Sequence, residues 1–290
     1  MILPWKNKKI NEEFLGINER NLDYVYSLNP KRHFKLADDK ILTKEVLKIN
    51  GISCADTYAV ISKIGEIPQI LKVLEQQKLV AIKPAKGAGG GGILILKKSQ
   101  DGDWFSGGVK FTNDQIFSHL ARIIMGMYSF GTTDRVLIEQ CIIPHEFFEK
   151  IYPCGVPDFR VIVSNDKPIM SMLRVPTDKS GGKANLHQGG LGIGINMDTG
   201  HLTHSFDGSR YFNFHPDNGN QIYGIKIPYW KDIINLSVQT SKCFPLDYLG
   251  IDIVIDEYLG PMIMEINVRP GLGIQLANKK GLRNPLIKIK

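Results

Sequence analysis

The sequence has few cysteines and no long apolar run. Its four cysteines among 290 residues form no Cys-x-x-Cys pair, which excludes a disulfide-dense scaffold and favours reduced, buried thiols. Apolar runs such as Pro261–Met264 are far too short to span a bilayer, and the first ten residues do not resemble a signal peptide. We therefore expect a cytoplasmic protein that does not bind membranes. The cysteines are Cys54, Cys141, Cys154 and Cys243.

The charge of the chain is basic but dispersed. The chain has 36 lysines and arginines and 29 acidic residues, so its formal net charge is +7, and the sequence pI is about 9.1. Only Lys6–Lys9 and the tail Leu286–Lys290 are locally basic. Hydrophobic residues at 43% and charged residues at 22% exclude intrinsic disorder. A field of this sign suits anionic small molecules such as nucleotides, so nucleic acid is not expected as a partner.

Glycine is the residue in excess, and part of the excess lies in one loop. Glycines make up 29 of the 290 residues, and five of them occupy Gly87–Gly92. The pattern predicts strands over Leu79–Lys83 and Ile93–Leu96, so the loop joins two strands, with Lys83 and Lys86 close by. No Gly-Lys-Ser/Thr follows, and no helix follows, which excludes Walker A and dinucleotide-binding loops. A phosphate-binding flap is favoured over a flexible surface hairpin tip.

The rest of the chain predicts two α+β lobes with no internal repeat. We expect an N-terminal extension over 1–40, a first lobe over 41–143 and a second lobe over 144–290. Thr43 is expected to cap a helix, and residues 178–200, rich in Gly, Lys and Asn, are expected to form a loop. The predicted helices are Asn18–Leu28, Lys44–Ile49, Ile67–Gln77, Asn113–Met127 and Tyr229–Cys243. Further predicted strands are Thr57–Ile61, Val136–Ile143, Asp158–Ser164 and Pro168–Val175, with short strands between Leu202 and Gly224.

An acidic hairpin is predicted near the end of the chain. In Gly250–Asp256 the isoleucines alternate with Asp252, and in Met262–Val268 Glu265 shares a face with Asn267. A hairpin through the intervening residues would bring these three polar side chains together over one face. Two carboxylates and an amide oxygen are the hard ligands that Mg²⁺ prefers. The alternative is an ordinary solvent-exposed face of an antiparallel sheet.

Taken in order along the chain, these motifs resemble the ATP-grasp superfamily. Over nearly its whole length the sequence is similar to the α-L-glutamate ligase homologues, also described as sugar-transfer-associated ATP-grasp proteins. The resemblance implies an α+β ATP-grasp fold with two lobes clasping a nucleotide and an N-terminal pre-grasp domain largely absent. The motifs are Asp38-Asp-Lys40, Ala81-Ile-Lys-Pro84 with the glycine loop, Leu137-Ile-Glu-Gln140, Pro157-Asp-Phe-Arg-Val161, Asn185-Leu-His-Gln-Gly-Gly190 and Glu265-Ile-Asn-Val-Arg-Pro-Gly271.

The resemblance also implies a set of ATP-binding residues. The phosphates are expected to contact the paired lysines Lys40 and Lys83. Residues 139–142 correspond to an edge strand whose backbone holds adenine, with Cys141 as a wall residue, and either Glu146 or Asp158 takes the ribose hydroxyls. The remaining ATP-binding residues implied are Lys86, Gly87, Gly89, Gly90, Gly91, Glu139, Gln140 and Ile142.

Metal, catalytic and substrate residues follow from the same resemblance. Asp252, Glu265 and Asn267 would hold two Mg²⁺ ions, with Mn²⁺ as a substitute. Arg160 and Arg174, together with Lys83, would stabilise charge on the transferring phosphoryl group. Asn185, His187 and Arg269 are the substrate candidates, although a loop position is also an ordinary place for a histidine. Arg269 stands where glutamate ligases often carry a small residue.

The activity implied is ATP-dependent ligation of a carboxylate to an amine through an acyl phosphate, with release of ADP and phosphate. The substrates would be small molecules or peptides. Only about 38 residues precede Asp39, so we expect a second copy of the chain or a protein partner to complete the substrate site. A small-molecule kinase of the same fold and a nucleotide-binding protein without turnover are the alternatives.

Overall fold

The structure is a computed structural model that describes residues 12–87 and 89–289. The basic stretch Lys6–Lys9, Ala88 of the glycine loop and the terminal Lys290 therefore lie outside the described residues. The chain divides into two compact units. One, here called the six-stranded unit, contains residues 39–44 and 55–142; the other, the seven-stranded unit, contains the remaining described residues. Within the described residues, no helix is long and apolar enough to cross a membrane.

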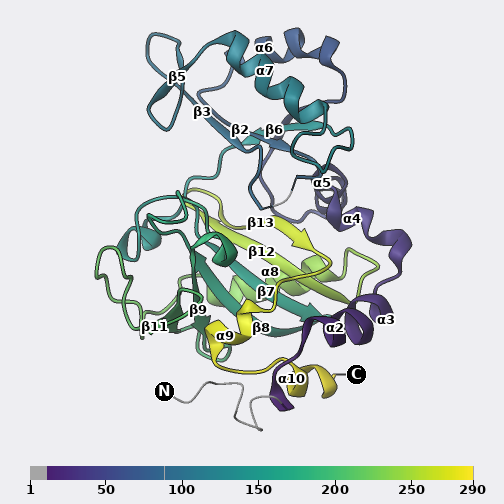
Figure 1. Ribbon diagram of the computed structural model, residues 1–290, viewed down its shortest axis with the longest axis vertical. Helices are drawn as coiled ribbons and strands as arrows, with labels where there is room; N and C mark the ends of the chain where they lie inside the picture. The colour runs from purple at the N-terminus through teal and green to yellow at the C-terminus, as the bar shows by residue number, and fades with distance from the viewer. Residues whose placement is uncertain (1–11, 88, 290) are drawn as a thin grey trace. The chain divides into compact units, whose positions relative to one another are not determined.

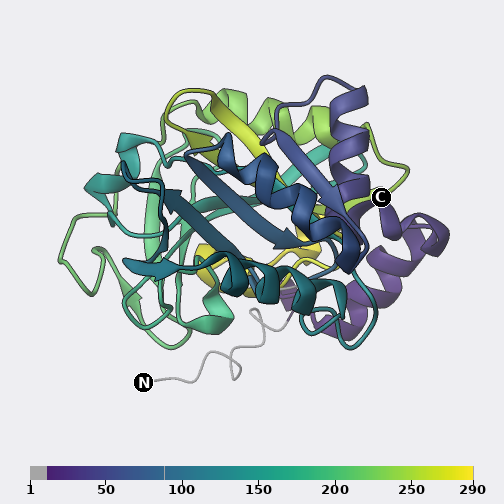
Figure 2. The ribbon, with the colours of Figure 1, turned by 90° about the horizontal axis from the view of Figure 1, so that it is seen from above.

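The six-stranded unit is an antiparallel sheet covered by two helices on one face (Figures 1 and 2). Its strand order is β1-β6-β2-β3-β4-β5. Both helices are amphipathic, and α7 begins with a capping box between Thr112 and Gln115. The elements are β1 (Thr57–Ile61), β2 (Leu79–Pro84), β3 (Leu94–Lys98), β4 (Trp104–Ser106), β5 (Val109–Phe111), β6 (Val136–Gln140), α6 (Ile67–Glu75) and α7 (Asn113–Ile124), with a 3-10 turn at Ile64–Glu66.

The alternation along β2 separates a packed face from a polar one. Val80 and Ile82 join the hydrophobic core under the two helices. Ala81 and Lys83 therefore point to the opposite face, where Ala81 is paired in register with Glu139 of β6. The sheet thus carries its predicted phosphate-side lysine on the face that α6 and α7 leave uncovered.

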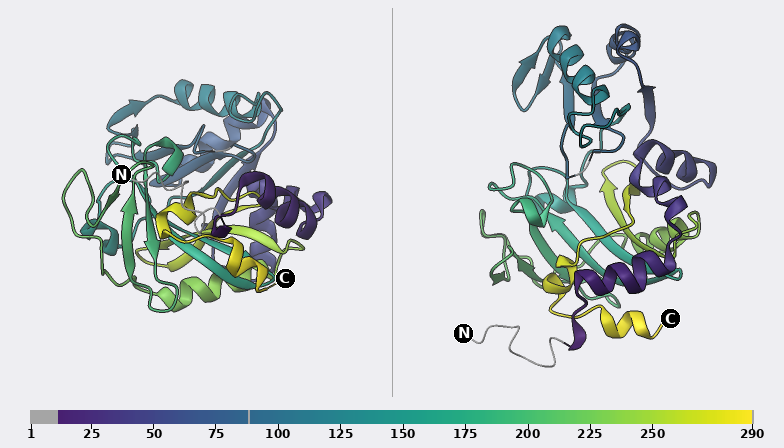
Figure 3. Two further views of the ribbon diagram at one scale, coloured as in Figure 1. Left: turned by 60° about the horizontal axis from the view of Figure 1, so that its bottom comes forward. Right: turned by 45° about the vertical axis from the view of Figure 1, so that its right-hand side comes forward.

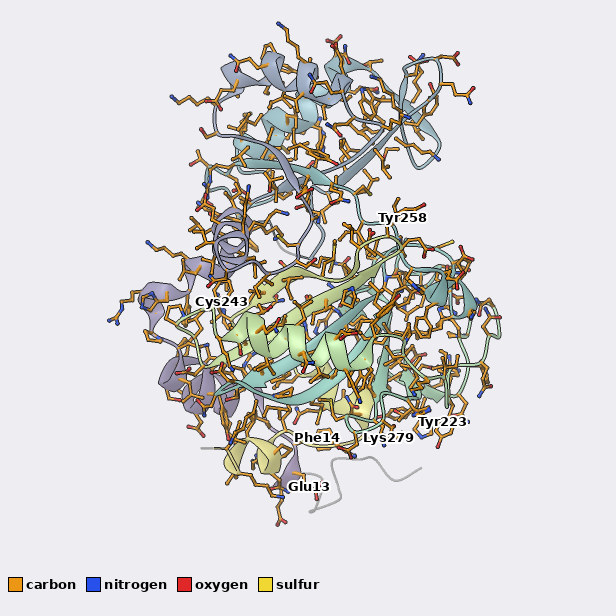
Figure 4. All side chains as sticks on the ribbon, turned by 180° about the vertical axis from the view of Figure 1, so that it is seen from behind. Glu13, Phe14, Tyr223, Cys243, Tyr258 and Lys279 are labelled. Atoms are coloured by element: carbon orange, nitrogen blue, oxygen red, sulfur yellow. The ribbon has the colours of Figure 1, made fainter. Side chains whose placement is uncertain are left out.

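The seven-stranded unit is also an antiparallel sheet, in the order β11-β10-β9-β8-β7-β12-β13. Helix α8 lies across one face, the one nearer the viewer in Figure 4, with Cys243 just beyond its end. Helix α9 packs on the other face, against β8, β9 and β10 (Figures 1 and 4). The elements are β7 (Asp158–Ser164), β8 (Lys167–Val175), β9 (Leu191–Ile195), β10 (Leu202–Phe206), β11 (Tyr211–Phe212), β12 (Tyr248–Asp256), β13 (Gly260–Asn267), α8 (Trp230–Ser241) and α9 (Gly273–Asn278).

The first described residues pack beside the C-terminal helices of the same unit (Figures 1 and 3). Arg283 forms an ion pair with Glu19 at 2.6 Å, and the Gln275 side chain bonds both backbone groups of Leu15. This segment is thereby an integral part of the seven-stranded unit. The remaining helical elements are α2 (Ile17–Arg20), a π-helical turn (Asn21–Val25), α3 (Tyr26–Leu28), α4 (Lys35–Asp38), α5 (Lys40–Ile49, whose first half belongs to the six-stranded unit) and α10 (Arg283–Ile287), with 3-10 turns at Lys31–His33, Glu146–Lys150 and Leu186–Gln188.

The expected α+β class is confirmed, but several local expectations are wrong. Thr43 does not cap a helix: α5 already begins at Lys40, and the Thr43 hydroxyl bonds the Asp39 carbonyl inside the first turn. The expected loop 178–200 contains β9, an interior strand. Strands β4 and β5 were not predicted. The cysteines form no disulfide, as expected, but none is buried, and Cys154 is exposed.

Candidate functional site

The glycine-rich loop joins β2 to β3 in a backbone conformation that requires glycine. Gly89, Gly90 and Gly92 have φ of +62°, +74° and +75°, the left-handed region that other residues rarely adopt. At the start of the loop, the Nζ atom of Lys40 donates to the carbonyl oxygen of Gly87 at 2.7 Å. Lys40 is therefore held beside the loop, and Lys86 is exposed at the loop entrance.

A buried carboxylate lies between two lysines on the uncovered face of the six-stranded sheet. Glu139 of β6 accepts from Lys83 Nζ at 2.5 Å and from Lys44 Nζ at 2.6 Å. Burial by itself raises the pKa of Glu139, but the two lysines outweigh it and hold the pKa below its usual range. Lys83 is thus held in place by Glu139 rather than left mobile.

Lys44 is a residue that the prediction of site residues missed. It follows Lys40 by four positions on α5, the spacing that places two side chains on one face of a helix. That spacing was the available signal, because it links Lys44 to a lysine already singled out.

The segment expected to hold adenine is not an edge strand, and that expectation is corrected. β6 lies in the interior of its sheet, between β1 and β2, because β1 pairs with its outer side. The strand ends at Gln140, whose backbone N–H bonds the Asp56 carbonyl oxygen at 2.8 Å. Cys141 and Ile142 therefore follow the strand instead of forming part of it.

The seven-stranded unit holds a buried network of arginine and carboxylate side chains. Arg160 of β7 donates to both carboxylate oxygens of Asp252 on β12, at 2.7 and 2.5 Å. Arg174 of β8 bridges Asp158, at 2.6 Å, and Asp252, also at 2.6 Å. Asp252 is fully buried and Asp158 is 2% exposed. The strand order β8-β7-β12 brings these four residues together from three neighbouring strands.

Burial and charge act differently on the members of this network. Burial raises the pKa of Asp158 above its usual range, and nearby Asp252 adds to the rise while Arg174 opposes it. Asp252 contacts both arginines, which outweigh its burial and lower its pKa. Burial also disfavours the charge of Arg174, but the two aspartates outweigh that effect and raise the Arg174 pKa. The Arg174 guanidinium group therefore remains charged beside an ionised Asp252.

The acidic hairpin forms as expected, with an irregularity in its register between Asp252 and Ile253. Asp252 lies directly opposite Glu265, and Gly250 opposite Asn267. The Nδ2 atom of Asn267 donates to Asp252 at 3.2 Å. Asp252, Glu265 and Asn267 are thus brought together, as expected.

The donor set fits a divalent cation, although not as a preformed cage. Two carboxylates directly opposite each other on neighbouring strands repel unless positive charge lies between or beside them. Arg160 and Arg174 supply that charge to Asp252 here, and a hard cation would supply it equally. Among the described residues, no group of three or more histidine, cysteine or acidic side chains is arranged as a complete metal site. To bind a metal ion, the Asp252 oxygens would have to give up hydrogen bonds from the Arg160 and Arg174 guanidinium groups.

The predicted residues Glu146, Asp158 and Asn185 also belong to this unit. Asp158 is committed to Arg174, whereas Glu146 is exposed and its backbone N–H bonds Glu257. The side-chain amide oxygen of Asn185 accepts from the backbone N–H of His187 at 3.0 Å, so it shapes the turn that carries His187.

Two substrate candidates lie at the segment that follows β13. A side-chain carbon added at Gly271 would come within 3.6 Å of the His187 Nε2 atom, so the structure brings His187 next to this segment. Arg269 pairs with Asp38 at 3.0 Å and lies over the ring of Phe34.

The two antiparallel α+β units, one with lysines beside a glycine-rich loop and one with an acid–arginine network, define the ATP-grasp class of proteins. Within that class, the model of the sugar-transfer-associated ATP-grasp family matches residues 19–290. The chain belongs to this family.

Individual relatives are distant. A protein of Photobacterium profundum named "Probable alpha-L-glutamate ligase" is 22% identical over 265 residues, which cover 91% of this chain and 66% of that protein. The chain therefore spans slightly less than two thirds of that relative's length.

Two solved structures share the fold. The D-alanine–D-alanine ligase of Bacillus anthracis has a TM-score of 0.51 at 15% identity, over 97% of this chain and 77% of that one. D-cycloserine synthetase DcsG has a TM-score of 0.51 at 12% identity, over 90% of this chain and 73% of that one. At this identity the likeness concerns the fold alone.

Proposed function

We propose that the protein is an ATP-dependent carboxylate–amine ligase. The carboxylate oxygen of one substrate attacks the γ-phosphorus of ATP, and ADP leaves. The amine of the second substrate then attacks the acyl carbon of the acyl phosphate, phosphate leaves, and the nitrogen loses a proton. Membership of the ATP-grasp family and the names of the ligases that share the fold support this reaction class.

The six-stranded unit is proposed to bind the phosphates of ATP. The backbone N–H groups of the glycine-rich loop and the ammonium groups of Lys40 and Lys83 are the donors on this side. The salt bridge to Glu139 holds Lys83 in a fixed orientation, which lowers the entropy lost when it meets a phosphate. Residues 139–142 are proposed to contact adenine. Glu146, rather than the already paired Asp158, is proposed to bind the ribose hydroxyls.

The seven-stranded unit is proposed to neutralise the charge that moves during phosphoryl transfer. Mg²⁺, held by Asp252, Glu265 and Asn267, would draw negative charge from the phosphate oxygens. Arg160 and Arg174 place their guanidinium groups beside Asp252. Both residues lie on strands rather than in loops, so their backbones are held by the sheet. Removal of one such positive group costs about 10²-fold in rate in comparable sites.

The observation that carries the proposal is the cross-strand pair Asp252–Glu265 with two buried arginines on Asp252. Such a cluster is costly to bury, and its oxygen and guanidinium groups suit a phosphoryl group with its metal.

The test is a mass-spectrometric screen of acid and amine pairs with ATP and Mg²⁺, scored by ADP release and by a product that has lost one water relative to the pair. Hydroxylamine should trap the acyl phosphate when the amine is omitted. Release of AMP and pyrophosphate would contradict the proposal. A phosphorylated product that accumulates without amine and resists hydroxylamine would instead identify a kinase.

A further inference from the structure

The dipeptide Asp134-Arg135, immediately before β6, contacts both segments that carry the phosphate-side residues. None of the motifs of the sequence includes it, and all of its contacts described below lie within the six-stranded unit. We propose that Asp134 and Arg135 are positioning residues, which set the glycine-rich loop and the lysine-bearing start of α5 for binding of the ATP phosphates. This inference rests on the proposed function.

Asp134 fixes the entrance of the glycine-rich loop. Its carboxylate is 4% exposed, and its two oxygens accept from the backbone N–H of Lys86 at 3.2 and 3.0 Å. The same carboxylate accepts from the Ser129 hydroxyl and, at 2.7 Å, from the Arg135 backbone N–H. A carboxylate that accepts several bonds is a rigid anchor, so the backbone at Lys86 enters the loop in one fixed direction.

Arg135 connects the entrance of the glycine-rich loop to α5. Its carbonyl oxygen accepts from the Ala85 N–H, and the Ala85 carbonyl accepts from the Lys40 N–H, both at 2.9 Å. Its guanidinium group pairs with Asp39 at 2.6 Å. The other oxygen of Asp39 accepts from the N–H groups of Ile41 and Leu42, at 3.1 and 3.3 Å. Arg135 therefore orients the first turn of the helix that carries Lys40.

Two further contacts hold the far end of the loop. The Nε2 atom of His119 lies 3.0 Å from the carbonyl oxygen of Gly92. A side-chain carbon added at Gly92 would meet the Tyr128 ring at 2.6 Å, which shows how closely that ring packs on the backbone. The loop is therefore held at its entrance by Asp134 and at its far end by His119 and Tyr128.

The first test compares ATP with adenosine, because adenosine has no phosphate. In calorimetric titration of the full chain, Asp134→Ala should raise the Kd for ATP at least 10-fold and leave the Kd for adenosine unchanged. The ratio of adenosine Kd to ATP Kd therefore falls at least 10-fold. Asp134→Asn keeps one oxygen for Lys86 and Arg135, so its ratio should stay within about 3-fold of the parent protein. Asp103→Ala is the matched control, since Asp103 pairs with exposed Lys110 at the surface of the same unit, and it should leave the ratio unchanged.

The second test needs no nucleotide. Hydrogen exchange of peptides covering residues 85–92 should become at least 10-fold faster in Asp134→Ala, while peptides from the seven-stranded unit keep their rates. If Asp134→Ala does not fold, Arg135→Met, a change at a half-buried side chain, should lower the same Kd ratio.

An unchanged Kd ratio in a folded Asp134→Ala protein that binds ATP would overturn the inference, and so would unchanged exchange of the loop. A parent protein that binds no ATP would instead contradict the proposed function, and the exchange rates would still decide whether Asp134 positions the loop.

Discussion

Glu139 and Asp252 are buried carboxylates that each contact two basic side chains. In both cases the basic residues come from other elements than the acid, so the charge balance exists only in the folded chain. Removal of one member leaves the remaining buried charges unbalanced, which is why substitutions here affect stability as well as chemistry.

Glu139→Gln is expected to destabilise the six-stranded unit by about 3 kcal/mol, because Lys44 and Lys83 lose their common counter-charge. The folded pKa of Glu139 lies below its ordinary value, so its contribution is present above that value and is lost as pH falls through the lowered pKa. In urea unfolding, the variant should therefore have a lower free energy of unfolding than the parent protein at neutral pH. The difference between the two should shrink in acid. A difference that grows toward low pH would contradict the assignment.

Glu265→Gln is expected to lower the rate of ADP release by about 10²-fold, which corresponds to about 3 kcal/mol of transition-state stabilisation. Glu265 is half-buried, unlike Asp252, so the melting temperature should stay within a few degrees. Steady-state kinetics and thermal unfolding measure the two effects. Asp247→Asn, at an exposed acid just before β12, is the control. Activity retained in Glu265→Gln would remove Glu265 from the metal site.

At the scale of elements, the β12–β13 hairpin and the segment after it form one packed assembly. Gly250 pairs with Asn267, and a side-chain carbon at Gly250 would meet the Pro270 ring at 2.4 Å. The carbonyl oxygen of Pro270 accepts from the buried Arg20 at 2.6 Å. The strand, the N-terminal helical segment and the turn therefore fix each other's positions.

Gly250→Ala is expected to displace this turn. The added carbon overlaps Pro270, and overpacking of this kind costs about 1–3 kcal/mol. We expect a fall in melting temperature of roughly 2–10 °C and a loss of ligase turnover. Gly65→Ala serves as the control, because nothing lies within 4 Å of the added carbon there. A melting temperature equal to that of Gly65→Ala would show that the turn moves without cost.

At the scale of the whole molecule, ligand binding should be visible as stabilisation. If the protein binds ATP together with Mg²⁺, a concentration of Mg·ATP at 100 times its Kd adds about 2.7 kcal/mol to the free energy of unfolding. Thermal unfolding should therefore shift upward by several degrees with Mg·ATP. ATP with EDTA should give a smaller shift, and equal shifts with and without Mg²⁺ would contradict the metal requirement.

Much of the fold was predictable where the signal is local. The acidic hairpin follows from alternation along two short segments. Its register does not: the pairs from Asp256–Gly260 to Ile253–Ile263 would continue to Met264 opposite Asp252, and an irregularity between Asp252 and Ile253 places Glu265 there instead. Strand β9 was missed because its Leu-Gly-Ile-Gly-Ile sequence looks like part of a glycine-rich loop. Gly192 and Gly194 are needed for close packing, since added carbons would meet Ala277 at 3.2 and 2.5 Å. That requirement comes from a helix more than eighty residues away.

The sequence by itself determined the α+β class, the glycine-rich loop behind Lys83, the acidic hairpin and the family resemblance, because each depends on neighbouring residues or on motifs in order. Only the tertiary structure decided which charges meet. Arg160 and Arg174 contact Asp252, and Lys44 joins Lys83 on Glu139, through strand order and helix placement. Asp134-Arg135 has no motif of its own, since its role depends on backbone groups whose positions exist only after folding.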